Sequence, residues 1–137
     1  MKKFIFFAAL MTAVNFSFAQ KLQKGNLVGI HVMTIALKPN VTLDQFAEFY
    51  NTKVIPSFED AFQGVKGFLL KGKRGENTDR LSVLWQFETE QARDKFFNLD
   101  GSNTDAGKTA VEKVSQIGKE LEKLGSVTTV YTDWLVQ

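Results

Sequence analysis

The segment from residue 27 to residue 38, LVGIHVMTIALK, constrains the fold of this chain more than any other part of the sequence. It is rich in β-branched residues and follows a polar stretch, which is typical of a strand. Side chains alternate between the two faces of a strand. Both faces are apolar here, with Val28, Ile30 and Val32 on one and Met33, Ile35 and Leu37 on the other. We therefore expect a sheet that is covered on both sides, by helices on one face and by a second layer on the other.

The first helix is predicted directly after this strand. Thr42, with Gln45 three residues later, forms a capping box in which each residue satisfies a free backbone N–H of the other. Apolar residues at helical spacing follow. Pro56 lacks an N–H and its ring clashes with the preceding turn of a helix. We therefore expect Pro56 to kink this helix or to begin a short second one over residues 56–63.

Two further helices are predicted in the C-terminal half. Thr89 is a suitable N-cap for a helix over residues 90–99, which the sequence DGSN then interrupts. A longer helix over residues 104–124 carries a regular apolar stripe. Gly125 is expected to end that helix in the left-handed conformation.

Three remaining apolar segments predict strands, over residues 65–74, 80–88 and 126–136. The first two are close in sequence and should form an antiparallel hairpin. The order of elements is then β-α-β-β-α-β, which predicts an α+β, ferredoxin-like fold. Such a fold has a four-stranded antiparallel sheet with its helices on one face, and its first strand lies between the third and the fourth.

The N-terminus has the pattern of an export signal. Lys2 and Lys3 precede an apolar run over residues 4–14, and residues 17–19 (SFA) offer small side chains at the cleavage positions. We expect a signal peptide over residues 1–19 and a periplasmic or secreted protein. A membrane anchor is the alternative, but the apolar run is shorter than the roughly 20 residues that a spanning helix needs.

Cleavage would leave 137 − 19 = 118 residues, with a flexible start over 20–26 and a single domain over 27–137. Removal of Lys2 and Lys3 leaves 17 − 2 = 15 basic residues against 15 acidic ones, so we expect no nucleic-acid partner. No later segment is long and apolar enough to cross a membrane, so we also expect no membrane association of the mature chain. The chain has no cysteine and one histidine, which excludes thiol chemistry and a multi-histidine metal site within one chain. No nucleotide-binding loop or H-E-x-x-H motif occurs. We therefore expect no cofactor and no metal.

Two stretches carry a family resemblance: FYNTKVIPSFE in the first helix and FETEQARDKFF after the third strand. With them, residues 27–136 resemble the dimeric α/β-barrel superfamily, in particular its small members related to antibiotic-biosynthesis monooxygenases and stress-responsive barrel proteins. The resemblance implies a homodimer in which two sheets close face to face as a barrel. Members include cofactor-free monooxygenases, isomerases, haem-degrading enzymes and proteins without known activity, so the fold alone does not name a reaction.

His31 is the first candidate site residue. Its pKa range suits proton transfer, but it is equally a structural histidine, hydrogen-bonded within the sheet. Haem-degrading relatives use a helix histidine with an Asn and a Trp, and a histidine on a strand departs from that pattern. His31 shares a face with Met33, and we expect this face to be the open one, toward the dimer cavity. An imidazole there needs a hydrogen-bond partner, which Tyr131 or Gln86 could supply.

The last strand supplies the other candidates. Tyr131 and Asp133 share a face, and with His31 they form the set of candidate catalytic residues. The predicted ligand-binding residues are His31, Met33, Gln86 and Tyr131. Trp85, Tyr131 and Trp134 could line a cavity for a flat ligand or could be ordinary core residues.

Three functions remain open from the sequence. The first is an exported homodimer that binds a small apolar or aromatic molecule in the cavity between its two sheets. The second is a cofactor-free monooxygenase or isomerase that uses His31. The third is a structural or stress-related protein whose barrel is filled.

Overall fold

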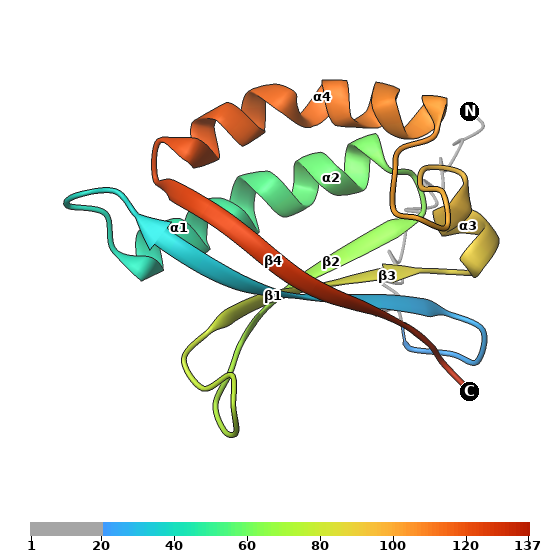
Figure 1. Ribbon diagram of the computed structural model, residues 1–137, viewed down its shortest axis with the longest axis horizontal. Coiled ribbons are helices and arrows are strands. Elements are labelled where there is room, and N and C mark those ends of the chain that lie inside the picture. The colour runs from blue at the N-terminus through green and yellow to red at the C-terminus, as the bar shows by residue number, and fades with distance from the viewer. Residues whose placement is uncertain (1–20) are drawn as a thin grey trace, which may run out of the picture.

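The computed structural model describes residues 21–137 and has the predicted order of elements (Figure 1). The predicted signal peptide, residues 1–19, lies outside the described residues. The elements are β1 (Leu27–Leu37), α1 (Leu43–Phe49), the π-helical turn η1 (Tyr50–Val54), α2 (Ile55–Ala61), β2 (Val65–Lys71), β3 (Leu81–Phe87), α3 (Glu90–Asp94), α4 (Asp105–Glu122) and β4 (Gly125–Leu135).

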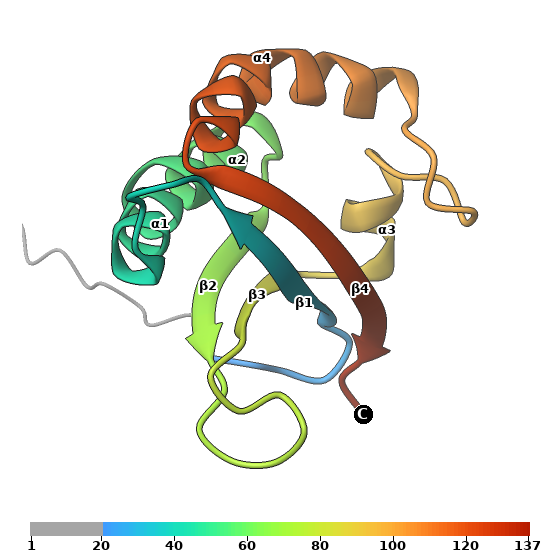
Figure 2. The same ribbon diagram turned by 60° about the vertical axis from the view of Figure 1, so that its left-hand side comes forward.

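The four strands form one antiparallel sheet in the order β2-β3-β1-β4. Figure 2 shows the helices α1, α2 and α4 on one side of this twisted sheet, with α3 beside the far end of β4. The α+β, ferredoxin-like prediction is therefore confirmed. Strand β1 is central, and His31 pairs with Val83 of β3 on one side and with Tyr131 of β4 on the other.

The first helix runs through α1, η1 and α2 without a break. The capping box is present, because the backbone N–H of Gln45 donates to the Thr42 hydroxyl and that of Thr42 donates to the Gln45 side chain. In η1 the N–H of Ile55 donates to the carbonyl of Tyr50, five residues earlier. This wider turn comes directly before Pro56, where a regular α-helix would press the proline ring against a carbonyl. The proline then lies in the first turn of α2.

The C-terminal half differs from the prediction at two points. Helix α3 ends at Asp94, well short of residue 99. Gly125 is the first residue of β4 and has no positive φ, so the predicted left-handed cap is wrong. A Cβ at Gly125 would lie 2.8 Å from the carbonyl oxygen of Ala36, which shows that close contact with β1 is what requires glycine here.

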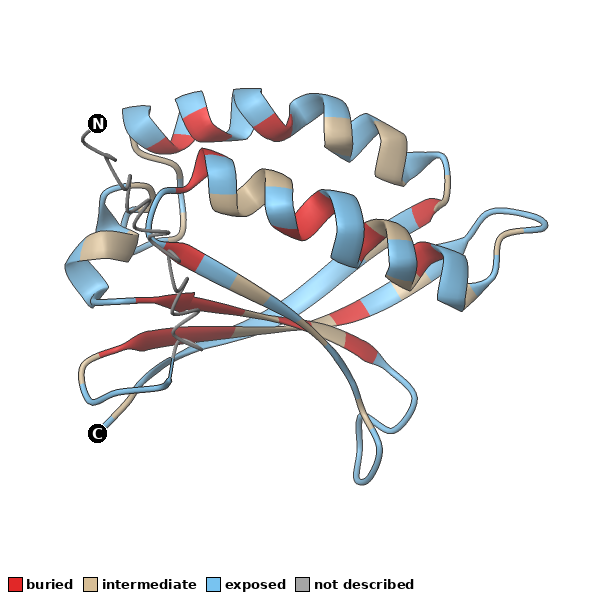
Figure 3. Cartoon of the chain, turned by 180° about the vertical axis from the view of Figure 1, so that it is seen from behind, coloured by how far each residue is buried: buried red, intermediate tan, exposed pale blue. Residues whose placement is uncertain are grey.

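The helices cover the face of β1 that carries Leu27, His31 and Met33, not the face that carries Val28 and Ile30. Our assignment of the two faces was therefore wrong. Met33 is 2% exposed and lies in the main core. The larger side chains of β1 lie on the helix side, because they fill the space between the sheet and the helices, as close packing requires. Figure 3 shows buried positions along the helices and along the strands.

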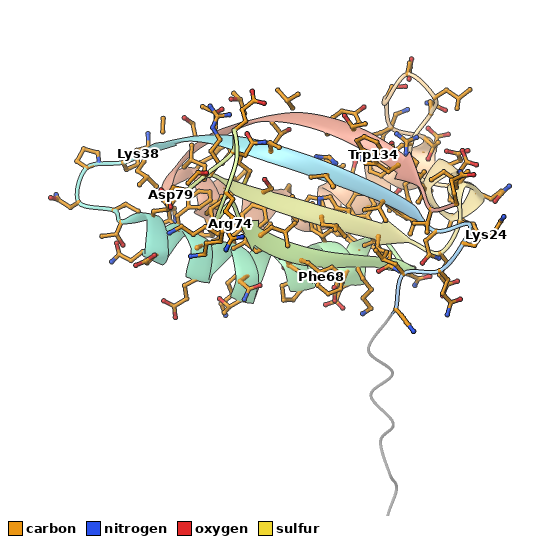
Figure 4. The ribbon with its side chains drawn as sticks, turned by 90° about the horizontal axis from the view of Figure 1, so that it is seen from below. Lys24, Lys38, Phe68, Arg74, Asp79 and Trp134 are labelled. Atoms are coloured by element: carbon orange, nitrogen blue, oxygen red, sulfur yellow. The ribbon has the colours of Figure 1, made fainter. Side chains whose placement is uncertain are left out.

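No helix of the described chain covers the other face of the sheet, which Figure 4 shows from below. This open face includes Phe68, Val130 and Trp134, which are 45%, 78% and 58% exposed. The hydroxyl and amide groups of Thr128, Thr132 and Gln86 lie among them. The expectation that both faces of the sheet carry apolar side chains is thus correct.

The segment that precedes β1 is held at this face. Residues 20–26 are predicted to form a flexible start. In the described part of this segment, the N–H of Gly25 donates to the carbonyl of Val136, and the N–H of Val136 donates to the carbonyl of Asn26. The Asn26 side chain accepts from Gln86 Nε2 at 2.9 Å and donates to the carbonyl of Glu88. The described part of this segment therefore joins the end of the sheet.

Candidate functional site

A cavity of about 300 Å³ lies between the helices and the sheet, at the end near α3. Its apolar wall is made of aromatic rings from both layers: Phe58, Phe62, Trp85, Phe87 and Phe97. Phe58 stacks on Trp85 with ring centroids 5.1 Å apart, and Phe62 stacks on Phe97 at 5.5 Å. Ring faces of this kind suit a flat apolar molecule, and the volume is at the lower end of the range for small-molecule sites.

The sheet contributes a polar group of three side chains to the same cavity. The ring of His31 stacks on that of Tyr131, with centroids 4.9 Å apart and an angle of 17° between the planes. A Cβ on Gly29 would lie 3.3 Å from His31 Nε2 and 2.8 Å from Asp133 Oδ1. The absence of a side chain at Gly29 therefore gives the imidazole and the carboxylate the space that they share.

His31 is held in its neutral form. Burial lowers its pKa below the ordinary value of 6.5, and the nearby charge of Asp133 opposes that effect only in part. A neutral imidazole has one nitrogen that donates and one that accepts a proton or hydrogen bond. Above pH 6.5 the site therefore presents a weak base beside a carboxylate.

Arg93 of α3 completes this end of the cavity. Its Nε lies 3.4 Å from Asp133 Oδ2, and its Nη1 donates to the backbone carbonyls of Phe97 and Asn98. The guanidinium carbon also lies 5.3 Å from the centre of the Phe97 ring. The Arg93 side chain is only 12% exposed, so this ion pair is more than a surface contact. Its charge is balanced by Asp133 and its donors hold the segment after α3.

Tyr50 faces the cavity from the helix side. It lies in η1, the residue as a whole is 9% exposed, and burial raises its pKa to about 12. Within residues 21–137 we find no hydrogen bond to its hydroxyl. The hydroxyl therefore stays protonated at physiological pH and is free to bond to a molecule in the cavity.

The loop between α3 and α4 closes the cavity beside Tyr131. Gly101 has a φ of 81°, a left-handed conformation that favours glycine. A Cβ at Gly101 would lie 3.0 Å from the Tyr131 hydroxyl. This close approach brings the loop directly against β4.

The structure brings some predicted site residues together and separates others. His31, Tyr131 and Asp133 all line the cavity, on the face of the sheet that the helices cover. Met33 lies on the same face but is part of the packed core. Gln86 is on the opposite face and bonds to Asn26, so it is not the partner of His31.

The sequence reasoning missed Tyr50, Arg93 and the phenylalanines of the cavity. Tyr50 lies at helical spacing within the first predicted helix, so the sequence distinguishes it only as part of that helix's apolar face. Arg93 follows Ala92 in a short helix. Its position in the helical period does not distinguish it from an exposed arginine. Trp134 was grouped with Trp85, yet register places Trp134 on the open face and Trp85 in the cavity.

The described residues contain neither a metal-binding cluster nor a membrane-spanning helix. Across positions 21–137, no three His, Asp or Glu side chains converge in a way that could hold a metal ion. None of the helices in this region is long and apolar enough to cross a membrane.

Comparisons with known proteins identify the fold. No protein-family model matches the sequence, and no curated protein matches it significantly. An uncharacterised NIPSNAP-like domain protein from Burkholderia xenovorans superposes with a TM-score of 0.51 at 12% identity, over 84% of this chain and 88% of that one. This likeness shows a shared fold and no more.

Two further solved structures are less similar. SnoaB, a cofactor-independent oxygenase from Streptomyces nogalater, has a TM-score of 0.45 at 14% identity, over 82% of this chain and 94% of that one. A dimeric protein of unknown function and ferredoxin-like fold from Bacteroides fragilis has a TM-score of 0.39 at 10% identity, over 82% and 97%. These two likenesses carry no argument. The fold expected from the sequence is confirmed by the strand order and by the likeness to the NIPSNAP-like domain protein.

Proposed function

We propose that this protein binds a small, uncharged aromatic molecule in the cavity between its helices and its sheet. The observation that carries the proposal is the cavity itself, about 300 Å³ in volume and walled by aromatic rings. This cavity lies within one chain, between its helices and its sheet, and is distinct from the cavity between two sheets that the sequence led us to expect.

Charge supports the choice of an uncharged ligand. The charged side chains that line the cavity are Arg93 and Asp133, which neutralise each other at 3.4 Å. Among the described residues that line the cavity, an anion would meet no unpaired cation, and burying an unpaired charge is costly. An aromatic molecule with a neutral polar group would instead meet the His31 imidazole and the Asp133 carboxylate.

Binding can be tested with 1-tetralone and isothermal titration calorimetry. Thr129 lines the cavity from β4 and is exposed, so Thr129→Trp should fill the opening without disturbing the core. Thr109→Trp is the matched control, because this exposed threonine of α4 lies outside both the cavity lining and the open face of the sheet. We expect Thr129→Trp to lower the affinity at least tenfold and Thr109→Trp to leave it unchanged. If 1-tetralone does not bind the unmodified protein, or if the two variants behave alike, the cavity is not a ligand site.

Proton abstraction from a bound ligand is a second candidate function. It is favoured by one observation, the neutral His31 beside Asp133 around Gly29. A neutral imidazole can accept a proton from an acidic C–H or O–H, the first step for a cofactor-free monooxygenase or an isomerase. Hydrogen–deuterium exchange at C1 of 2-tetralone, followed by NMR in D₂O, measures this step directly. Faster exchange than in buffer, lost in His31→Gln while binding persists, would establish it; equal rates for both proteins would exclude His31 as the base.

We also propose that the open face of the sheet pairs with that of a second copy. Phe68, Val130 and Trp134 expose large apolar groups on it, and exposed apolar patches of this kind commonly mark interfaces. Light scattering should give twice the chain mass for the mature protein. Val130→Glu should yield a monomer, whereas Leu99→Glu, at a position 96% exposed outside this face, should not. A monomer before mutation would refute the pairing.

Export remains a proposal that rests on the N-terminal pattern. N-terminal sequencing of protein from the periplasm or the medium should begin at Gln20. Soluble protein there that retains Met1 would contradict it.

A further inference from the structure

The hydroxyl of Tyr50 has no evident role in the fold. Of the cavity-lining residues in the helical segment 43–62, Tyr50 alone is polar. As a whole residue, Tyr50 is 9% exposed. Nothing within the described residues bonds to the hydroxyl, yet no described side chain has a polar atom that is both fully enclosed and unpaired. The oxygen is therefore not fully enclosed, and Tyr50 is among the residues that line the cavity.

The rest of the side chain could be supplied by phenylalanine. The ring of Tyr50 packs on Phe46 with centroids 6.0 Å apart, within the main core. An unpaired hydroxyl adds nothing to such packing and loses hydrogen bonds to water on folding. The residue also lies on a π-helical turn, and such turns frequently occur at functional sites. A tyrosine in this position is explained if its hydroxyl bonds to whatever occupies the cavity.

We propose that the Tyr50 hydroxyl donates a hydrogen bond to an acceptor oxygen of the ligand, which makes the ligand an uncharged aromatic carbonyl compound. The inference rests on the proposed binding function and adds the chemical class of the ligand. Tyr50 approaches from the helix layer, whereas His31 and Asp133 approach from the sheet. A carbonyl oxygen is the acceptor that a protonated phenol recognises without placing a charge in the apolar wall.

A pair of probes that differ by one oxygen tests this directly. 1-Tetralone and tetralin have the same ring system, and only the ketone can accept a hydrogen bond. We expect Tyr50→Phe to weaken binding of 1-tetralone about 3- to 10-fold, the effect of one neutral hydrogen bond. Binding of tetralin should not change. An equal effect on both probes, or none on 1-tetralone, would overturn the inference while leaving the binding function intact. Failure of both probes to bind the unmodified protein would overturn both.

The carbonyl stretch of ¹³C-labelled 1-tetralone gives a second readout that a purely structural tyrosine would not move. A hydrogen bond from Tyr50 should lower the frequency of bound ligand, and Tyr50→Phe should restore it. Folding is controlled by thermal melting. Because the hydroxyl has no partner in the fold, the variant should melt at the same temperature or higher. A clear fall in the melting temperature would show that the hydroxyl is bonded within the protein, and the inference would be wrong.

Discussion

Truncation of Phe62 tests whether the aromatic wall of the cavity is a packed part of the core. Phe62 is 2% exposed and contacts three other rings, those of Phe58, Phe96 and Phe97, at centroid distances of 5.2 to 5.5 Å. Phe62→Ala removes these contacts and opens new space next to the existing cavity. The surrounding rings cannot easily collapse into a space that adjoins a void.

The expected loss of unfolding free energy is about 3–5 kcal/mol, typical of Phe to Ala changes in a core. Each lost ring pair contributes about 0.5–1.5 kcal/mol beyond the buried area, which places the value toward the upper end. A domain of this size has a total stability of only about 5–15 kcal/mol, so the change should be large.

Urea denaturation followed by circular dichroism measures this loss. Protein concentration must be held constant, because any self-association would shift the midpoint by mass action. The midpoint should fall while the slope is unchanged, since the surface exposed on unfolding is nearly the same. Leu99→Ala, at a position 96% exposed, is the control and should cost less than about 0.5 kcal/mol. A loss below about 1 kcal/mol for Phe62→Ala would mean that this ring does not hold the wall as described.

Other substitutions and pH changes give independent checks. Because burial raises the pKa of Tyr50 to about 12, the unfolded chain loses the phenolic proton first, and the free energy of unfolding should fall as pH rises from 10 to 12. Urea midpoints across that range should fall less steeply in Tyr50→Phe. The lowered pKa of His31 means that the unfolded chain takes up its proton first, so stability should fall as pH drops below 6.5, and His31→Gln should flatten this part of the profile. Gly118→Ala, in the exposed interior of α4 with no atom within 4 Å of the new Cβ, should stabilise the protein by about 0.5–1 kcal/mol in the same denaturation assay. Gly67→Ala should destabilise it by about 1–3 kcal/mol, because its Cβ would overlap Trp85 and Ile55; a neutral result would show that β2 is not packed against these side chains.

Local sequence patterns predicted the elements of this fold well. The capping box at Thr42, the period of two in the strands and the apolar stripe of α4 all depend on residues a few positions apart, and the structure confirms them. The prediction for Gly125 was wrong because close contact with β1 is what requires glycine at this position. The contacting residues of β1 are almost 90 positions away in sequence. A pattern within the segment contains no information about that partner.

The candidate site was predicted in part. Tyr131 was proposed as a neighbour of His31 from strand order alone, and the structure stacks the two rings. Gln86 was proposed with equal weight, but it occupies the opposite face, which the register of β1 with β3 decides. Arg93 was not identified, since its pairing with Asp133 joins two segments 40 residues apart.

By itself, the sequence determined the order of strands and helices, the central position of β1 and the absence of thiol chemistry, because these follow from periodicity, topology rules and composition. It also determined which residues of β1 share a face. Tertiary structure alone decided which of those faces the helices cover, and with it whether His31 lies on the open side of the sheet or in a cavity. Both faces of β1 are apolar, so alternation is equally satisfied by either choice. The choice follows from how the large side chains of distant segments fill the space between the layers.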